Sequence, residues 1–221
     1  MTMIRFASNG GTAEGHLAEA QPETRRGGIV VIQEWWGLND QTKRVADRFA
    51  ATGYDALAPD LYQGKRTKSP DEAQKLLMAL DIARAERDLR GALAHLRERT
   101  GKAPAIVGFC MGGALSLYAA CAGGDEVGAC IVYYGGHPKV RYDFNRLTAP
   151  VLGHWAEKDD FGNATRDTVA AELKRRGKRF EFHTYPGTQH AFANEDRPSV
   201  YHAAATEEAW HRTVAFLAAS L

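Results

Sequence analysis

The sequence predicts an α/β protein with a mainly parallel central sheet and helices on both faces. Two observations predict this class: short apolar runs alternate with amphipathic stretches, and runs such as residues 29–32 consist of consecutive branched apolar residues. Such runs are typical of parallel strands covered on both faces, and regular strand–helix alternation implies right-handed crossovers. The 221 residues contain no repeat and no Pro/Gly/Ser-rich linker, so we expect one domain over residues 1–221.

The elements are expected in the following order. Strands are predicted at residues 27–37, 54–62, 103–110, 128–135, 149–160 and 178–187. Helices are predicted at residues 39–53, 70–99, 112–122, 165–177 and 200–221. Asn39 or Asp40 is suited to capping the first helix, and the long second stretch is expected to break near Asp81. Ligands of such sheets bind beyond the carboxyl ends of the strands, so the loops there are where chemistry is expected.

Composition and charge indicate a soluble globular protein. Hydrophobic residues make up 44% and charged residues 25% of the chain, and the net charge is only +1. Basic and acidic residues are interleaved, which argues against a nucleic-acid partner. The N-terminus lacks the apolar core of a secretory signal, and no segment approaches the roughly 18 apolar residues of a membrane span. We therefore expect no membrane association and a cytoplasmic location.

The chain has three cysteines, at positions 110, 121 and 130. An odd number in a chain of this size argues against a disulfide framework and fits a reducing compartment. Cys121 falls in a predicted helix and Cys130 in a predicted strand, and for both we expect a packing role.

Cys110 stands in a different context, the sequence Gly108-Phe109-Cys110-Met111-Gly112 between a strand and a helix. The pattern G-x-C-x-G has the form of a nucleophile elbow, a tight turn that presents a reactive side chain at a helix N-terminus. The helix dipole there favours a thiolate. An isolated cysteine is more commonly a core residue, but the flanking strand, glycines and helix favour a nucleophile.

An acid and then a histidine follow Cys110, in the chain order that such a triad requires. Asp159 and Asp160 end a predicted strand, and His190 follows the last predicted strand. A carboxylate there can hold the imidazole in one tautomer, and the imidazole can exchange a proton with the sulfur. Asp60 is a competing carboxylate, but it precedes Cys110 and suits a turn cap. No zinc-binding motif with two histidines on one helix occurs, so neither a metal nor another cofactor is expected.

With these residues in place, the chain resembles the dienelactone hydrolase family of α/β-hydrolases, also called carboxymethylenebutenolidases. The similarity runs from about Gly28 to the C-terminal helix. Its marks are QEWWG at residues 33–37, APDLY at 58–62, GFCMGG at 108–113, YYG at 133–135, the acid loop around Asp159 and QHAF at 189–192. The resemblance implies an α/β-hydrolase fold. The short stretch between YYG and Pro150 is too small for a separate lid domain.

The resemblance also implies catalytic roles. Cys110 matches the family's nucleophile, Asp159 rather than Asp160 its acid, and His190 its histidine. Glu34 matches a glutamate that moves toward the sulfur on substrate entry and helps to generate the thiolate.

The implied oxyanion hole consists of the backbone N–H groups of Trp35 and Met111. Candidate substrate-binding side chains are Trp36, Phe161 and Asn194.

The substrate-binding end departs from the family pattern. Enzymes that act on dienelactone bind its carboxylate with two arginines, one after the APDLY segment and one four residues beyond the histidine. The second position is Asn194 in this chain, and the first falls near Pro70, with only Lys65, Arg66 and Lys68 close by. The resemblance therefore does not identify dienelactone as the substrate.

The expected activity is hydrolysis of an ester or lactone of a small molecule through a thioester acyl-enzyme. Because a thiolate is also a good leaving group, the site should favour compact lactones, enol esters or aryl esters. Two alternatives remain open: the same triad acting on thioesters or phosphotriesters, and a non-catalytic thiol sensor or binding module on the same fold. The protein is expected to be a monomer or a small homo-oligomer.

Overall fold

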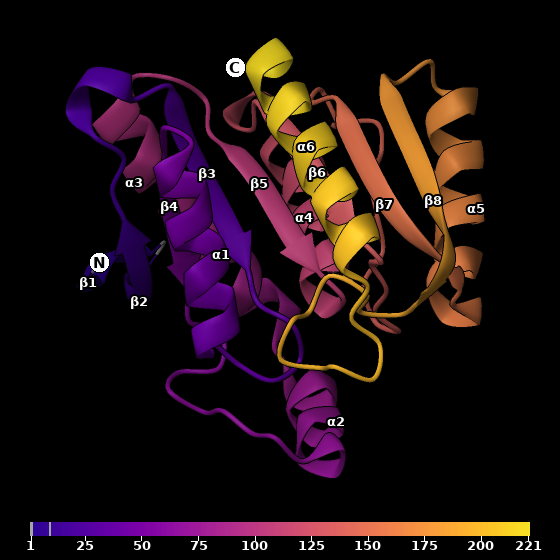
Figure 1. Cartoon of the computed structure of the whole chain (residues 1–221). Helices are drawn as coiled ribbons and strands as arrows, with labels where there is room; N and C mark the ends of the chain where they lie inside the picture. The colour runs from indigo at the N-terminus through magenta and orange to yellow at the C-terminus, as the bar shows by residue number, and fades with distance from the viewer. Residues whose placement is uncertain (1, 9) are drawn as a thin grey trace.

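The computed structural model describes residues 2–8 and 10–221, and an eight-stranded sheet in the order β1-β2-β4-β3-β5-β6-β7-β8 forms its centre (Figure 1). The strands are β1 (Thr2–Ser8), β2 (Gly11–Ala18), β3 (Gly27–Ile32), β4 (Tyr54–Pro59), β5 (Ala105–Phe109), β6 (Ala129–Tyr133), β7 (Val151–Lys158) and β8 (Phe180–Gln189). Strands β3 to β8 run parallel, whereas β2 pairs antiparallel with β4 and with β1. The predicted mainly parallel sheet is confirmed, and the fold is that of an α/β-hydrolase.

The antiparallel strands β1 and β2 are absent from the sequence prediction, which placed the first strand at residue 27. The residues of β1 and of the first half of β2 alternate between exposed and inward-facing side chains. The exposed pair Arg5 and Glu14 faces across the two strands at 3.2 Å. Such alternation is typical of an edge hairpin with one solvated face. The prediction relied on continuous apolar runs, so it missed this class of strand.

The described part of the chain contains six α-helices. They are α1 (Asp40–Ala51), α2 (Pro70–Ala79), α3 (Ile82–Thr100), α4 (Met111–Gly123), α5 (Asp160–Arg175) and α6 (Ala203–Ser220), with 3-10 turns at Pro22–Thr24 and Gly124–Glu126. Helices α1 and α6 cover one face of the sheet, and α3, α4 and α5 cover the other (Figure 1). The predicted break near Asp81 is confirmed, because Asp81 caps α3 by accepting a hydrogen bond from the N–H of Arg84 at 3.1 Å.

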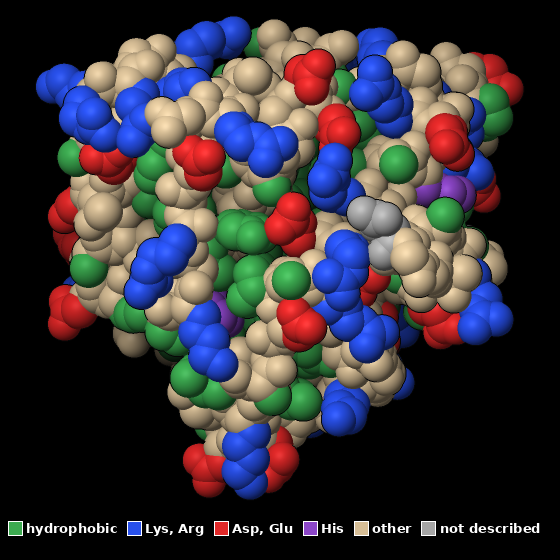
Figure 2. All heavy atoms as spheres, turned by 180° about the vertical axis from the view of Figure 1, so that it is seen from behind, with side chains coloured by type: hydrophobic (Ala, Val, Ile, Leu, Met, Phe, Trp, Pro, Cys, Tyr) green, Lys and Arg blue, Asp and Glu red, His purple; other side chains and the backbone are tan. Residues whose placement is uncertain are grey.

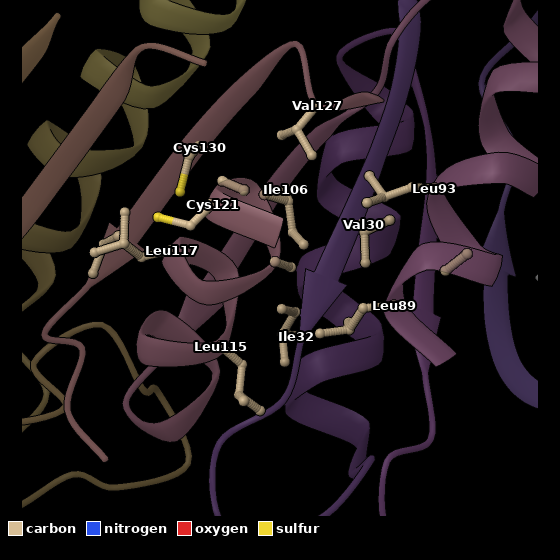
Figure 3. Close-up of a cluster of buried hydrophobic side chains, with 14 of the residues drawn as sticks. Val30, Ile32, Leu89, Leu93, Ile106, Leu115, Leu117, Cys121, Val127 and Cys130 are labelled. Carbon is tan, nitrogen blue, oxygen red and sulfur yellow. The ribbon is translucent and has the colours of Figure 1, made fainter. Parts of the chain in front are cut away.

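The sheet separates two apolar cores because its central strands are buried on both sides. Ile29 and Val31 of β3 face α1 and α6, while Val30 and Ile32 face α3 and α4. Figure 3 shows the second core, in which β3 and β5 meet side chains from α3 and α4, such as Leu89. The continuous apolar runs of the sequence therefore correspond to strands without a solvated face.

Cys121 and Cys130 lie in this second core (Figure 3). Both thiols are buried, and burial raises the pKa of Cys121 to about 12 and that of Cys130 even further. Neither side chain is available as a thiolate near neutral pH, in agreement with the packing role expected for both. Cys110 is the partly accessible cysteine of the three.

A buried carboxylate joins the N-terminal segment, β4 and α3. Asp55 of β4 is fully buried and accepts hydrogen bonds from the N–H of Ala20 at 2.9 Å, from Arg25 at 3.1 Å and from Arg99 at 3.2 Å. Elsewhere the surface charges are mixed: basic and acidic side chains alternate over the face in Figure 2. Within the described residues, no helix combines the length and apolar character that a membrane crossing requires.

Candidate active site

The candidate residues meet at one edge of the sheet, beyond the carboxyl ends of its parallel strands. Glu34 follows β3, Cys110 follows β5, Asp159 follows β7 and His190 follows β8. These strands are neighbours or near neighbours in the sheet, so residues separated by up to 156 positions, from 34 to 190, are brought together. Helix α2 lies beyond the same edge, below the ends of the strands in Figure 1.

Cys110 occupies a strained turn between β5 and α4. Its backbone angles are φ 55° and ψ −118°, a conformation that costs an L-residue about 1–3 kcal/mol. The turn depends on flanking glycines: a Cβ atom on Gly108 would stand 1.9 Å from the carbonyl oxygen of Gly112, and one on Gly112 would stand 2.5 Å from that of Gln33. The close approach of β3, β5 and α4 therefore holds the sulfur at the start of α4.

His190 and Asp159 form a close pair beside this turn. The Nδ1 atom of His190 lies 2.6 Å from Oδ2 of Asp159, while Oδ1 of Asp159 accepts from the N–H of Gly162 at 3.0 Å. With Nδ1 donating to the carboxylate, Nε2 is left for the thiol of Cys110, which lines the same pocket. Asp160 is exposed and occupies the first turn of α5.

The environment shifts both titrating groups of this pair. Burial acts to lower the pKa of His190, but the hydrogen bonds with Asp159 and Cys110 outweigh it and raise the pKa. Burial acts to raise the pKa of Asp159, but the hydrogen bond and positive charge of His190 and the N–H of Gly162 hold it below its ordinary value. Asp159 is therefore ionised wherever His190 accepts a proton, which stabilises an imidazolium formed there.

Glu34 lies under the same site with 4% of its surface exposed. Its Oε2 accepts from the side-chain amide of Asn194 at 2.8 Å, and its Oε1 accepts from the hydroxyl of Tyr134 at 3.2 Å. Burial raises the pKa of Glu34, opposed by the Asn194 hydrogen bond and by the charges of His190 and Arg197. The carboxyl group of Glu34 therefore binds a proton more readily than an exposed glutamate does.

The two backbone groups expected to bind an oxyanion belong to Met111, which follows Cys110 directly, and to Trp35. Met111 is the first residue of α4, so its N–H has no acceptor within the helix. Trp35 follows Glu34 in the loop after β3 and lines the pocket that contains Cys110.

We call this cavity of about 320 Å³ the triad pocket; Cys110, His190 and Glu34 lie in its wall. The remaining wall is mostly apolar, and Phe161, one of the candidate substrate-binding residues, belongs to it. The other lining residues are Trp35, Gln74, Leu77, Gly136, Pro138, Ala191 and Arg197. Gln74 and Leu77 belong to α2, so this helix closes one side of the pocket without forming a separate domain.

Two of the candidate substrate-binding residues lie elsewhere. Trp36 and Asn194 line a neighbouring cavity of about 840 Å³, not the triad pocket. Asn194 is almost fully buried and also accepts, through its Oδ1, the N–H of Asp196 at 3.1 Å. Its amide therefore joins Glu34 to the loop that follows His190.

Two further residues of the site were not assigned roles from the sequence. The ring of Tyr134 meets the ring of His190 edge-on at 5.2 Å while its hydroxyl holds Glu34, so it contacts both groups. Its place in the YYG motif was the available signal. Arg197, in the wall of the triad pocket, follows His190 by seven residues instead of the four of the family pattern, so spacing alone did not reveal it.

Within residues 2–8 and 10–221, no group of three or more His, Cys, Asp or Glu side chains is arranged to hold a metal ion. The triad pocket instead brings together a thiol, an imidazole paired with a carboxylate, and the N-terminus of α4, an arrangement that can carry out acyl transfer.

Comparison with known proteins identifies relatives over nearly the whole chain. The model of the dienelactone hydrolase family matches residues 14–221, beginning within β2 and thus earlier than Gly28. "Protein usf" of Aquifex pyrophilus is 34% identical over 224 residues, covering 97% of this chain and 96% of that protein. A protein of Aquifex aeolicus named "Putative carboxymethylenebutenolidase" is 30% identical with the same coverage.

Solved structures share the fold. The crystal structure of a "Putative Dienelactone Hydrolase" from Klebsiella pneumoniae superposes with a TM-score of 0.85 at 25% identity, covering 98% of this chain and 97% of that one. The dienelactone hydrolase-like promiscuous phosphotriesterase P91, from metagenomic libraries, superposes with a TM-score of 0.87 at 24% identity, covering 99% and 97%.

Proposed function

Since the chain belongs to the dienelactone hydrolase family, we propose that it hydrolyses an ester or lactone of a small molecule, with Cys110 as nucleophile, His190 as base and Asp159 as the carboxylate that orients His190. The observation that carries the proposal is the placement of a strained cysteine in one pocket with an imidazole that is hydrogen-bonded at 2.6 Å to a buried carboxylate. A structural cysteine requires neither the strain nor the pair.

In the first half-reaction, His190 Nε2 takes the proton of the Cys110 thiol and the sulfur attacks the carbonyl carbon. The C=O bond becomes a C–O⁻ bond in the tetrahedral intermediate, whose oxyanion accepts from the N–H groups of Trp35 and Met111. Loss of one such donor typically costs about 3 kcal/mol in transition-state stabilisation. The intermediate collapses to a thioester when the bond to the leaving oxygen breaks and His190 returns its proton to that oxygen.

In the second half-reaction, His190 takes a proton from water and the resulting hydroxide attacks the thioester. Collapse of the second tetrahedral intermediate breaks the C–S bond, releases the acid and leaves the sulfur to recover the proton. The pair of His190 with Asp159 supports both steps, because the ionised carboxylate stabilises the imidazolium each time.

Glu34 is proposed to assist formation of the thiolate by moving toward the sulfur when substrate enters and accepting a hydrogen bond from the thiol, whose proton then passes to His190. Burial raises the pKa of Glu34, which makes its carboxyl group a better hydrogen-bond acceptor than an exposed one. In the structure its two oxygens are held by Tyr134 and Asn194, so movement toward the sulfur exchanges at least one of these hydrogen bonds.

The proposed substrates are esters or lactones with stable leaving groups. We propose that the protein acts as a monomer or a small homo-oligomer and needs neither a nucleic acid nor a membrane. A mostly apolar cavity of about 320 Å³ accepts a compact acyl group. Hydrolysis at phosphorus is the second candidate, because P91, which shares the fold, is a promiscuous phosphotriesterase.

The test measures hydrolysis of 4-nitrophenyl acetate and of paraoxon by the wild-type protein and by Cys110→Ala. Cys110→Ala should lose at least about a thousandfold in rate, with unchanged unfolding by circular dichroism. Cys121→Ala is the matched control, since this cysteine lies within α4, the helix that begins directly after Cys110, but in the core, and it should retain the rate. An acyl adduct on Cys110, detected by mass spectrometry, supports ester hydrolysis through a thioester. Turnover of paraoxon but not of 4-nitrophenyl acetate favours hydrolysis at phosphorus. Unchanged turnover in Cys110→Ala contradicts both proposed reactions.

A further inference from the structure

Another cavity lies between helices α1 and α6, on the face of the sheet that both helices cover (Figure 1). We call it the α1–α6 pocket; its volume is about 240 Å³. Phe109 and Tyr133, the last residues of β5 and β6, line it from the sheet, and Ala193 and Tyr201 line it from the segment between β8 and α6. None of its lining residues lines the triad pocket, so the two are separate sites.

Aromatic rings form much of the wall of the α1–α6 pocket and are held in place. Phe109 and Tyr133 stack with their ring centres 4.6 Å apart, and the hydroxyl of Tyr133 is hydrogen-bonded to that of Thr213 at 2.8 Å. On the side of α6, the guanidinium of Arg48 lies 4.0 Å from the centre of the Trp210 ring. The pocket therefore has preformed apolar surfaces against which a planar ring can pack.

Gln41 contributes a polar group without a partner to this pocket. It lines the pocket from the first turn of α1, and only 3% of its surface is exposed. The neighbouring Thr42 is satisfied, because its N–H and its hydroxyl donate to Oδ1 of Asn39 at 3.0 and 3.1 Å. The side-chain amide of Gln41 has no hydrogen-bond partner among the residues that the structure describes. Since buried polar groups are nearly always hydrogen-bonded, this amide points to a ligand that supplies the missing partner.

The charged side chains around the α1–α6 pocket neutralise one another. Arg44 is paired with Glu195 at 2.7 Å and with Asp196 at 2.6 Å, and Arg48 is paired with Glu207 at 2.6 Å. Both arginines and Glu195 line the pocket. The pocket thus offers no unbalanced charge that would select an anion or a cation.

We infer that the α1–α6 pocket binds a compact, uncharged aromatic molecule that carries an amide or hydroxyl group, with this group hydrogen-bonded to Gln41 and the ring against Phe109 and Trp210. A cavity of about 240 Å³ is smaller than the roughly 300–1,000 Å³ of sites for drug-sized ligands, so it accepts a single substituted ring. Because Phe109 directly precedes Cys110, the ligand contacts the strand end that carries the proposed nucleophile without entering the triad pocket. The inference does not depend on the proposed hydrolysis.

Benzamide is a suitable probe, because its single ring carries a primary amide that can both donate to and accept from Gln41. Titration of the ¹⁵N-labelled wild-type protein should shift the indole NMR signal of Trp210 with a saturable Kd of about 1 mM, whereas the signal of Trp35, in the wall of the triad pocket, should change little. The variants Trp210→Phe and Trp35→Phe assign the two signals. Absence of a saturable shift of the Trp210 signal overturns the inference, whether or not the Trp35 signal responds.

Gln41→Leu tests the hydrogen bond, because leucine has a similar volume and no polar group. It should raise the Kd for benzamide at least about fivefold, and the protein should stay folded, because an unpartnered buried amide is replaced by an apolar group. Gln74→Leu is the matched control, since it removes a glutamine amide from the triad pocket, and it should leave the Kd unchanged. An unchanged Kd in Gln41→Leu would mean that Gln41 only packs, which overturns the assigned ligand contact.

Benzoate tests the charge of the ligand, because it has nearly the same shape as benzamide and carries a negative charge. It should bind to the wild-type protein at least about fivefold more weakly than benzamide. Equal or tighter binding of benzoate would show that Arg44 and Arg48 attract an anion in spite of their ion pairs, and would contradict an uncharged ligand.

Discussion

Asp159 and Asp160 are adjacent in the chain but differ in what they contact. Asp159 is buried and bound to His190 and to the N–H of Gly162, whereas Asp160 is exposed. Asp159→Asn should lower kcat at least about a hundredfold, because an amide does not stabilise the imidazolium and can favour the wrong tautomer. Asp160→Asn should change kcat less than about threefold. Rates for 4-nitrophenyl acetate decide between them, and the reverse ranking would assign the acid to Asp160.

The side-chain amide of Asn194 donates a hydrogen bond to the buried carboxyl group of Glu34. Asn194→Ala removes an interaction that lowers the pKa of Glu34, so that pKa should rise further. A folded-state pKa above the unfolded value makes stability fall as pH rises between the two values. The variant should therefore be less stable than the wild type by about 1–3 kcal/mol at about pH 8, and the difference should shrink at about pH 5.

Urea unfolding at both pH values measures this difference. Asp196→Ala is a suitable comparison, because this exposed residue meets Asn194 only through its backbone N–H, which the substitution retains. A loss of stability in Asn194→Ala that is equal at the two pH values would mean that the hydrogen bond does not control the titration of Glu34.

The sequence predicted the candidate catalytic residues better than it predicted the other residues that line or support the pocket. Cys110 and His190 could be selected because the elbow glycines and the chain order restrict the alternatives. Arg197 could not, because an irregular loop of turns carries it to the pocket wall and no periodicity relates its position to that of His190. The role of Asn194 was equally hidden, since its partner Glu34 is 160 residues away.

Among the elements, the junction of β5 with α4 depends most directly on small residues. Gly108→Ala should destabilise the protein by about 3 kcal/mol or more, because the added Cβ would lie 1.9 Å from the carbonyl oxygen of Gly112 and the backbone has to move. Gly11→Ala is the control, since a Cβ there meets nothing within 4 Å. It should change stability by less than about 1 kcal/mol. Similar unfolding midpoints for the two variants would contradict the tight packing of the elbow.

The elements that the sequence predicted are those with a single dominant signal. Strands β3 to β7 have buried apolar runs, and the boundary between α2 and α3 has the capping residue Asp81. Strands β1 and β2 have neither, because their alternating side chains match a solvated edge and their partners are each other and β4. Helix α5 begins at Asp160 instead of residue 165, because the side chain of Asp159 serves both as its cap and as the partner of His190.

At the scale of the whole molecule, Asp55 connects three parts of the chain that are distant in sequence. Asp55→Ala should lower the free energy of unfolding by about 2 kcal/mol or more, because it leaves the N–H of Ala20 and two guanidinium groups without their acceptor. Asp167→Ala removes an exposed carboxylate paired with Arg166 and should cost less than about 0.5 kcal/mol. Chemical denaturation compares the two, and equal losses would show that the buried network contributes no more than a surface ion pair.

The loop after β8 has a practical consequence for engineering. Between positions 190 and 197 it carries both the imidazole proposed to transfer protons and Arg197, which lines the triad pocket, while the proposed nucleophile follows another strand, β5. A library randomised only at residues 195–197 would change which substrates are accepted. Cys110 and the strand and helix that hold it would stay unchanged. Laboratory evolution toward new esters should therefore accumulate its first beneficial changes in this stretch.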